Sequence, residues 1–442
     1  MMFWRLFIII VTVLNLAQAK LSKPAKTPEK TVPPRIVLIA YEVSETLDLL
    51  RMRRQLLAKF PGARVTFISF GPCSDVVIQE NPQPLISLCN ILPVEIYDLQ
   101  DDPEISRAIK YPHSLVQNIV SKAPADFIIT GMSSRIQQQL AKQYKMTGAR
   151  VITYYDSFAK PIHEDGKTIK YIRPFMKFVS YIDTILVTSN VLQTAFRAHK
   201  SAQHATIYVV GKPSLDKWRE HYVEVWSGKL RNKYNITAKK VVLFAGDNSK
   251  TYKDAFQVFV NAAKQLPSVQ FVVTYLANAA TKGDFERRII ESHGAENIQV
   301  VPYSEDITID LSKIADVMIM HKSSEGPAAL SVGLPVIYIA NEAYSNFAIE
   351  QGLADRVYDE EAMLRIIRAK ILNGRSRSSR IAKQVPQNGF QNFLNQYEGF
   401  KQLLTKPEAA NLDKDKDKVN QKQGDYNGTN TVKHDATGNK GT

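Results

Sequence analysis

Buried-strand patterns alternate with helix patterns along most of this 442-residue chain, and this alternation limits the fold more than any other feature. Strands separated by helices pair in parallel, with the helices as crossovers on the sheet faces. An α/β fold with parallel sheets is therefore expected. The strands predicted in the first half are Arg35–Ala40, Ala63–Ser69, Val94–Tyr97, Asp126–Thr130, Ala149–Tyr154 and Thr184–Thr188, and the helices are Leu47–Lys59, Pro112–Ser121, Ser133–Tyr144 and Val191–His199.

The same rhythm repeats in the second half. Two such series exceed one ordinary domain, so we expect two Rossmann-like domains. On the first helix, the spacing predicts that Leu47, Leu50, Arg54 and Leu57 share one face. The second series predicts strands Val241–Ala245, Gln270–Thr274, Ile298–Val301, Val317–Met320 and Pro335–Ala340, and helices Tyr252–Gln265, Asp284–His293, Pro327–Val332, Glu361–Leu372 and Asn388–Leu404.

The two ends of the chain differ in composition from the middle. Met1–Ala19 has a positive start, a short apolar core and small residues at Ala17 and Ala19, which predicts a cleaved secretory signal. Export through the secretory pathway to a periplasm, a secretory lumen or the exterior is expected, with an uncleaved membrane anchor as the alternative. The predicted organisation is a signal peptide at 1–19, a Pro/Lys-rich linker at 20–34, domains at 35–212 and 213–387, a last helix at 388–405 and a disordered polar tail at 406–442.

The net charge of +14 favours anionic partners. Nucleic acid is not expected, because the chain has no zinc-finger spacing and no aromatic RNA-binding signature. The alternative is that scattered lysines only keep the protein soluble. Cys73 and Cys89 could pair in an oxidising compartment or stay separate thiols, and two cysteines without paired histidines predict no metal site.

The segment Val317–Ala340 reads as strand, polar turn, short helix and strand. Pro327 suits the first helical turn, and Gly333 ends the helix. A strand followed at once by a helix start gathers free N–H groups and favours phosphate. Ser323 and Ser324 add hydroxyl donors at this turn, whereas His321 is expected to be a satisfied polar residue at the strand end.

A second strand-to-helix turn, Gly246–Thr251, could add a basic contact. Gly246 allows a close backbone approach, and Lys250 can reach a phosphate as a point charge. The alternative is an ordinary capping loop with a solvated lysine.

These motifs together resemble the C-terminal half of GT-B-fold glycosyltransferases and of the related UDP-N-acetylglucosamine 2-epimerases. Val209–Asp216 looks like the Gly-Asn-x-x-x-Asp segment that opens their second domain, and Val241–Gly246 looks like its first strand and glycine turn. The resemblance covers roughly residues 35–404. It implies two Rossmann-like domains facing an interdomain cleft, with a C-terminal helix that crosses back to the first domain.

The resemblance also implies site residues in the second domain. The diphosphate of a nucleotide sugar would lie on Gly246, Lys250, Ser323, Ser324 and Gly326. Glu325 would take the place of the ribose-binding glutamate that family members hold further along the helix, or that contact is lost.

In the first domain the polar strand ends supply candidates for acceptor chemistry. Asp156 matches a glutamate of the epimerases by position only, and reads as a general base or as a turn residue. Glu42 could contact an acceptor hydroxyl. The turn formed by Ser133, Ser134 and Arg135 either caps a helix or faces an anionic acceptor.

The function expected from the resemblance is transfer of a sugar from a nucleotide sugar to a glycan, lipid or protein hydroxyl, without a bound metal and without a separate cofactor. The expected partners are the nucleotide sugar, the acceptor and an anionic surface, with the oligomeric state left open. The alternatives are a nucleotide-sugar epimerase or hydrolase, and a secreted binding protein that keeps the fold without the chemistry.

Overall fold

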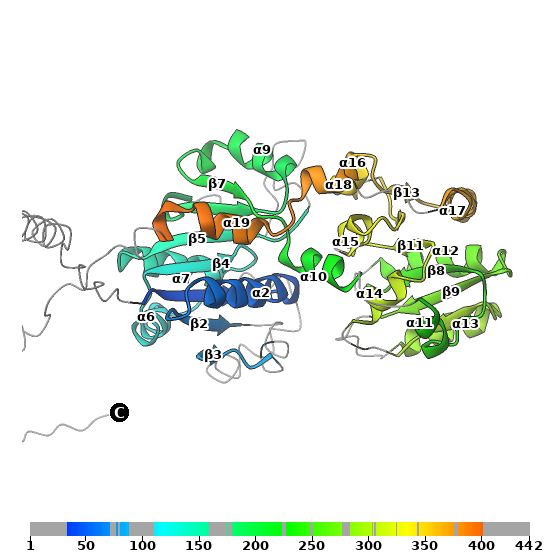
Figure 1. Cartoon of the computed structure of the whole chain (residues 1–442), viewed down its shortest axis with the longest axis horizontal. Helices are drawn as coiled ribbons and strands as arrows, with labels where there is room; N and C mark the ends of the chain where they lie inside the picture. The colour runs from blue at the N-terminus through cyan, green and yellow to red at the C-terminus, as the bar shows by residue number, and fades with distance from the viewer. Residues whose placement is uncertain are drawn as a thin grey trace, which may run out of the picture. The chain divides into compact units, whose positions relative to one another are not determined.

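The first half of the chain forms a parallel sheet of seven strands in the order β3-β2-β1-β4-β5-β6-β7 (Figure 1). Every neighbouring pair runs parallel, as helices between consecutive strands require. The strands are β1 (Arg35–Ala40), β2 (Arg64–Ser69), β3 (Leu85–Ser87), β4 (Phe127–Gly131), β5 (Arg150–Tyr155), β6 (Thr184–Val187) and β7 (Thr206–Val209), and the helices are α2 (Val43–Lys59), α6 (His113–Lys122), α7 (Arg135–Met146) and α9 (Asn190–Ala198), with 3-10 turns at Val179–Tyr181 and Lys200–Ala202.

The second half forms a separate parallel sheet of six strands in the order β10-β9-β8-β11-β12-β13. Its strands are β8 (Lys240–Ala245), β9 (Val269–Thr274), β10 (Ile298–Val300), β11 (Val317–Met320), β12 (Val336–Ile339) and β13 (Asp355–Val357). The helices are α10 (Pro213–His221), α11 (Ser227–Lys233), α12 (Tyr252–Lys264), α13 (Asp284–His293), α14 (Ile307–Ser312), α15 (Gly326–Ser331), α16 (Phe347–Glu350), α17 (Glu360–Asn373), α18 (Ser379–Gln384) and α19 (Gly389–Gln396).

Two parallel sheets confirm the α/β fold with two Rossmann-like halves. The edge strands β3, β7 and β13 are three or four residues long, and the sequence patterns did not predict them. Short edge strands carry little periodicity, because two residues on each face make no clear alternation. The sheets divide between β7 and β8, and the domain boundary at residue 212 stays a prediction.

The face predicted for α2 is only partly buried, since Leu50 is buried and Leu57 is half-buried. Leu47 is 44% exposed, and Arg54 lies on the surface. The buried stripe instead runs through Leu49, Met52 and Leu56, and two carboxylates, Glu45 and Asp48, continue it at the start of the helix. The helix also begins at Val43, four residues before the predicted start, so the segment after β1 is helix rather than loop.

The last helix returns to the first sheet, as predicted. The ring of Phe393 on α19 packs edge-on against Tyr208 of β7 at 5.1 Å between centroids. Tyr397 just after the helix packs against Phe127 of β4 at 6.4 Å. The preceding helix, α18, contacts α15 of the second half. Asn388 sits at the N-cap with a left-handed φ of 52° and makes no side-chain cap bond, which differs from the predicted cap.

The structure describes residues 33–70, 77, 80–87, 110–158, 175, 179–222, 227–247, 251–275, 283–302, 304, 306–323, 325–342, 344–374 and 379–400. The predicted signal peptide, most of the linker, both cysteines, the predicted strand Val94–Tyr97 and the polar tail lie outside these ranges, as do Lys250 and Ser324. None of the helices within these ranges has the length and apolar content needed to cross a bilayer.

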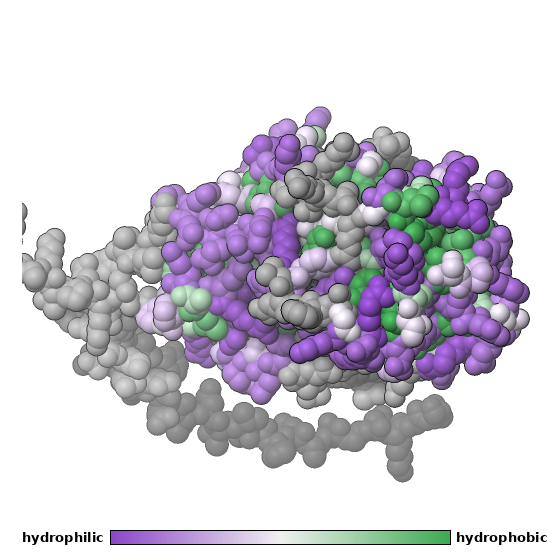
Figure 2. Space-filling model, turned by 45° about the vertical axis from the view of Figure 1, so that its right-hand side comes forward, coloured by the Kyte–Doolittle hydropathy of each residue, from purple (hydrophilic) through white to green (hydrophobic). Residues whose placement is uncertain are grey.

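The surface drawn in Figure 2 is mostly hydrophilic, with hydrophobic residues reaching it in several areas. Among the described residues, the large apolar side chains with the greatest exposure lie on α2, on α7, on α17 and in the turn before α17. They are Leu47, Met146, Tyr358 and Leu372. This distribution does not single out one docking face.

Candidate functional site

Each sheet has one point where the strand order reverses, and ligands of open α/β sheets bind outside the carboxyl ends of the strands there. In the first sheet this point lies between β1 and β4, and in the second between β8 and β11. The polar residues that follow these four strands and the adjoining strands β5 and β12 are therefore the candidates for a site.

At the first switch point, Glu45 is fully buried among hydrogen-bond donors. Its Oε1 accepts from the backbone N–H of Tyr41 at 2.6 Å and from Nε2 of Gln137 at 2.6 Å. The hydroxyl of Ser133 donates to its Oε2 at 3.0 Å. Gly131, the last residue of β4, lies so close that a Cβ there would overlap the Glu45 carboxyl group. The end of β4 is therefore shaped around this carboxyl group.

The surroundings of Glu45 favour its neutral form. Burial, followed by the nearby carboxylates of Asp156 and Glu42, raises its pKa to about 8, although the N–H groups of Tyr41 and Glu42 act in the opposite direction. Glu45 is therefore mostly protonated at neutral pH. Strongly shifted carboxyl pKa values cluster at functional sites, which makes this strand end a candidate.

Asp156 follows β5 and reaches solvent, since 20% of its side chain is exposed. Its Oδ2 accepts from the hydroxyl of Ser44 at 2.5 Å. The ammonium group of Lys212 lies 3.6 Å from the same oxygen and 3.1 Å from Oδ2 of the fully buried Asp48. Asp156 thus lies at the carboxyl end of the sheet, where a hydroxyl group and a cation hold its side chain in place.

The other first-domain candidates lie around this cluster. Glu42 is half-buried at the start of α2, and its N–H donates to Oε1 of Glu45 at 3.2 Å. Ser133 and Ser134 are buried, and their N–H groups both donate to Oε1 of Gln137 at 3.0 Å. Arg135 is exposed. The two serines hold the start of α7, as the capping alternative predicted, and a direct ligand contact by them stays a prediction.

At the second switch point, a chain of hydrogen bonds joins the ends of β8, β11 and β12. Nδ1 of the buried His321 lies against the carbonyl oxygen of Ile339, which can only accept, so that nitrogen carries the proton. Nε2 then accepts from the hydroxyl of Thr251 at 2.7 Å, and this hydroxyl accepts from Nζ of Lys322 at 3.2 Å. Both ring nitrogens of His321 have hydrogen-bond partners, as expected. The histidine thereby orients Thr251 and the exposed Lys322 at the carboxyl ends of the strands.

The predicted phosphate turn lies beside this chain. Ser323 and Glu325 are half-buried, and the Ser323 hydroxyl accepts from the N–H of Glu325 at 3.2 Å, which leaves its own proton free to donate. Burial raises the pKa of Glu325 to about 7, so the negative charge of this turn is partly removed at neutral pH. Helix α15 begins at Gly326, one residue before the predicted start, and Gly333 takes the left-handed φ of 81° that ends it.

The two glycines predicted to approach a ligand are required by packing. A Cβ on Gly246 would lie 2.6 Å from the carbonyl oxygen of Thr274 in β9. A Cβ on Gly326 would overlap the hydroxyl of Tyr338, which is buried beneath α15. Both glycines therefore let neighbouring elements pack closely at the sheet edge, and a ligand contact by either stays a prediction.

Gly326→Ala is expected to lower the free energy of unfolding by about 1–3 kcal/mol, since the added methyl group meets the rigid ring of Tyr338. Urea unfolding measures the change. Gly228→Ala is the matched control, because a Cβ there meets nothing within 4 Å. Equal stability of the two variants would show that Tyr338 can move aside.

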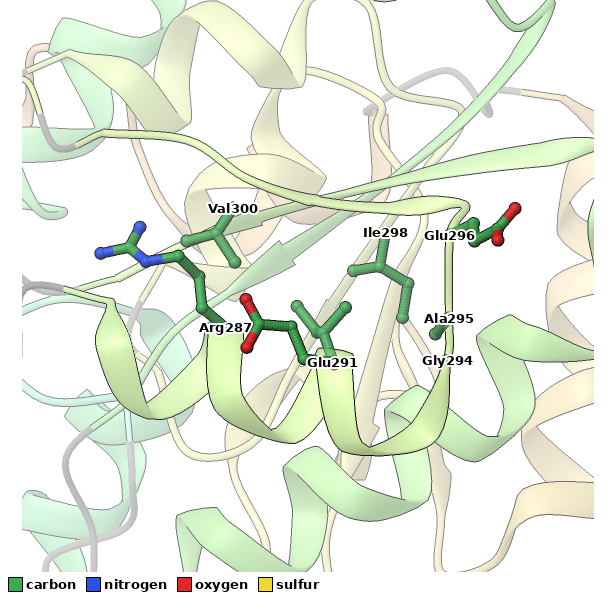
Figure 3. Close-up of a pocket in the computed structure, with 8 residues that line it drawn as sticks. Arg287, Glu291, Gly294, Ala295, Glu296, Ile298 and Val300 are labelled. Atoms are coloured by element: carbon green, nitrogen blue, oxygen red, sulfur yellow. The ribbon is translucent and has the colours of Figure 1, made fainter.

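A hollow of about 330 Å³ lies elsewhere, between α13 and the edge strand β10 (Figure 3). Ile298 and Val300 of β10 line it, with Arg287 and Glu291 on the facing helix, and Ile290 of the same helix also lines it. No residue of either switch point lines it, so we do not assign the nucleotide site to this hollow.

Several site residues were missed by the sequence reasoning: Ser44, Glu45, Asp48, Gln137, Lys212, Thr251 and Lys322. A signal existed for some of them. Asp48 lies on the predicted helix Leu47–Lys59, beside the apolar Leu49, and Lys212 stands where the resembled segment has asparagine. Among the described residues, no group of three or more His, Cys, Asp or Glu side chains could hold a metal ion.

Comparisons with known proteins agree on the fold. No protein-family model matches the sequence, and no curated protein matches it. Among solved structures, UDP-GlcNAc 2-epimerase from Neisseria meningitidis bound to UDP-GlcNAc is similar with a TM-score of 0.61 at 10% identity, over 81% of this chain and 98% of that one. The S. aureus MnaA co-structure with UDP gives a TM-score of 0.60 at 11% identity, over 84% and 98%.

A glycosyltransferase from Rickettsia africae gives a TM-score of 0.53 at 16% identity, over 84% of this chain and 96% of that one. At these identities the likeness establishes the fold alone. With its two parallel sheets and a last helix that returns to the first sheet, the chain has the two-domain fold of GT-B glycosyltransferases and UDP-GlcNAc 2-epimerases.

Proposed function

We propose that this protein is a GT-B-type glycosyltransferase that uses a nucleotide sugar, with UDP-sugars as the first donors to test. The observation that carries the proposal is the complementary chemistry of the two switch points. A lysine and two hydroxyl groups lie at the second, where a diphosphate needs donors. Carboxylates lie at the first, where an acceptor hydroxyl needs a base.

On the donor side, Lys322 and Ser323 would hold the diphosphate together with the N–H groups at the start of α15. Lys322 is exposed, and its ammonium group is already directed to the sheet edge by Thr251. Glu325, half neutral at pH 7, would repel a diphosphate less than an ionised carboxylate and could meet a ribose hydroxyl. Lys250 and Ser324 remain predicted partners of the same phosphates.

On the acceptor side, Asp156 would act as the general base, with Glu42 as the second candidate. The acceptor oxygen forms a bond to the anomeric carbon as the bond to the diphosphate oxygen breaks. The proton of the acceptor hydroxyl passes to Asp156, and the nucleoside diphosphate leaves with the bonding electron pair. The cation and N–H groups at the second switch point would stabilise its charge.

Two other functions remain in competition. Epimerases are among the similar structures. The resembled epimerase family, however, carries a His-x-Glu-Ala-Gly segment at the place of Asp156, and this sequence has no His-x-Glu pattern. A binding protein without catalysis would keep the nucleotide contacts and lose turnover. Export also stays a proposal, and it would place the protein in a compartment where nucleotide sugars are scarce unless that compartment is a eukaryotic secretory lumen.

A thermal-shift panel of UDP, GDP, CDP and UDP-sugars tests the proposal. A ligand at about 100 times its dissociation constant should add about 2.7 kcal/mol of stability. Release of UDP from a UDP-sugar, with and without a glycan acceptor, then separates transfer from binding. Epimerisation of the sugar without release of UDP would favour the epimerase, and silence across the panel would exclude nucleotide-dependent function.

Lys322→Ala is expected to weaken UDP binding by about 1.5–3 kcal/mol, since it removes a charge-assisted contact to the diphosphate. Isothermal titration measures the dissociation constant. Lys264→Ala, an exposed lysine at the other end of α12, should leave it unchanged. If the wild type binds UDP and Lys322→Ala binds equally well, the diphosphate lies elsewhere.

A further inference from the structure

Lys212 belongs to the segment that leads from β7 to α10, where the chain leaves the first sheet, and its position there is unusual for a lysine. Only 5% of it is exposed. Its ammonium group lies 3.1 Å from Oδ2 of Asp48 and donates to the main-chain oxygen of Asp156 at 3.0 Å. Buried lysines are rare, because an ammonium group loses much hydration free energy when it leaves water. The contacts of this one therefore call for an explanation.

Asp48 alone does not account for the second contact of Lys212. Asp48 is also satisfied by the hydroxyl of Tyr154 at 3.0 Å and by the N–H of Ser214 at 2.7 Å. Lys212 balances the single charge of Asp48. Beyond that, its ammonium group also contacts both the carbonyl oxygen and the carboxylate of Asp156. Asp156 is thereby held from two elements, by Lys212 from the crossing segment and by Ser44 from α2.

The crossing segment is itself fixed to the second crossing, where the chain returns from α18 to α19. A Cβ on Gly211 would overlap the carbonyl oxygen of Pro386. Oδ2 of Asp216 accepts from the N–H of Asn388 at 3.2 Å, and Arg219 donates to the carbonyl oxygen of Val385 at 3.4 Å. The two crossings therefore contact each other, so the position of Lys212 depends on both of them.

We propose that Lys212 is a positioning residue, which sets the Asp156 carboxylate according to the arrangement of the two crossings between the sheets. This inference rests on the proposed function, since it names what aligns the base for the acceptor. A rotation of the second half about the crossings would move the ammonium group and shift Asp156 with it. Asp156 would then be aligned only when the donor and acceptor sites are correctly arranged.

The test compares two variants that share one background. Asp48→Asn removes the buried carboxylate charge, and Lys212→Met added to it removes the ammonium group without leaving an uncompensated charge. UDP-sugar turnover and UDP binding are measured for both. We expect kcat to fall about 100-fold between the single and double variants, as misplacement of a catalytic group does, while KM and the dissociation constant of UDP change less than twofold. Lys212→Arg in the wild-type chain should give an intermediate kcat, because it keeps the charge but not the shape.

Hydrogen exchange supplies a reading that needs no turnover. UDP should slow exchange in the peptide that spans the end of β5 and Asp156 in the Asp48→Asn background, and this effect should vanish once Lys212 is removed. Protection of the turn after β11 by UDP should persist in both variants. If the double variant does not fold, Lys212→Arg is compared with the wild type by the same two measurements.

The outcomes distinguish failure of the proposed glycosyltransferase function from failure of the proposed role of Lys212. A wild-type chain that binds no nucleotide overturns the proposed function and this inference together. UDP binding with an unchanged kcat, or with unchanged exchange at the end of β5, overturns the role of Lys212 alone. A loss of kcat accompanied by an equal loss of UDP affinity also overturns it, since a positioning residue of the first domain should not affect the donor site.

Discussion

Lys212→Met is expected to lower the free energy of unfolding by about 3–5 kcal/mol, the range found when one partner of a buried ion pair is removed. The change leaves Asp48, which is fully buried, without a cation. The hydroxyl of Tyr154 and the N–H of Ser214 remain bonded to it, but neutral donors do not offset a whole buried charge. Urea unfolding of the variant and the wild type measures the difference.

Two further variants decide whether the charge is the cause. Adding Asp48→Asn to Lys212→Met should recover a large part of the loss, because no charge is then buried, the amide oxygen can accept from the N–H of Ser214, and the amide N–H can donate to the hydroxyl of Tyr154. Arg54→Met breaks an ion pair with Glu80 at the surface, where the arginine side chain is 62% exposed, and should cost no more than about 1 kcal/mol. A loss of that small size for Lys212→Met would mean that water or movement of Asp48 relieves the buried charge.

The parts of the fold that were predicted from sequence are those with local signals. Strand β11 and helix α13 have the bounds that their apolar runs and flanking residues predicted. The long apolar strands of a parallel sheet are buried on both faces and stand out against polar turns. The last helix was placed on the first sheet by resemblance, and the aromatic contacts of Phe393 and Tyr397 confirm it.

The first-domain site was only half predicted, because its burial depends on partners far along the chain. Asp156 was found, since it ends a strand. Glu45 was missed because the helix was predicted to begin at Leu47, which left Glu45 in the loop after β1, where a glutamate reads as a solvated residue. The donor that makes its burial tolerable, Gln137, lies 92 residues away. Helical periodicity cannot show such a contact, since it describes one element at a time.

The second-domain site was predicted better, because a turn between a strand and a helix is a local motif. The order of Ser323, Glu325 and Gly326 around the start of α15 agrees with the expected turn. Lys322 was missed, although it lies within that turn. Its direction depends on Thr251, which is 71 residues earlier and reaches the same edge only because β8 and β11 are neighbours in the sheet.

Glu45→Gln is expected to remove a large part of the pH dependence of stability. In the unfolded chain Glu45 ionises near pH 4.5, whereas in the folded protein its pKa is about 8. Between these values folding takes up one proton at Glu45, so its contribution to stability is fully present below pH 4.5 and is lost as the pH rises to about 8. The slope is about 1.4 kcal/mol per pH unit. The loss over the whole interval is therefore about 5 kcal/mol.

The measurement is urea unfolding at half-unit steps from pH 5 to 8.5. Glutamine keeps the shape of the protonated side chain but does not titrate. The free energy of unfolding of the variant should therefore rise steadily relative to that of the wild type as the pH increases. Other titrating groups, including Asp216 with a raised pKa of about 6, are present in both proteins and cancel in the difference. Ser133→Ala, which removes a hydrogen bond to Glu45 and keeps its carboxyl group, should retain the wild-type slope. Parallel curves for Glu45→Gln and the wild type would mean that the carboxyl group is ionised in the folded protein at neutral pH, and that the donors around it, rather than a proton, balance its burial.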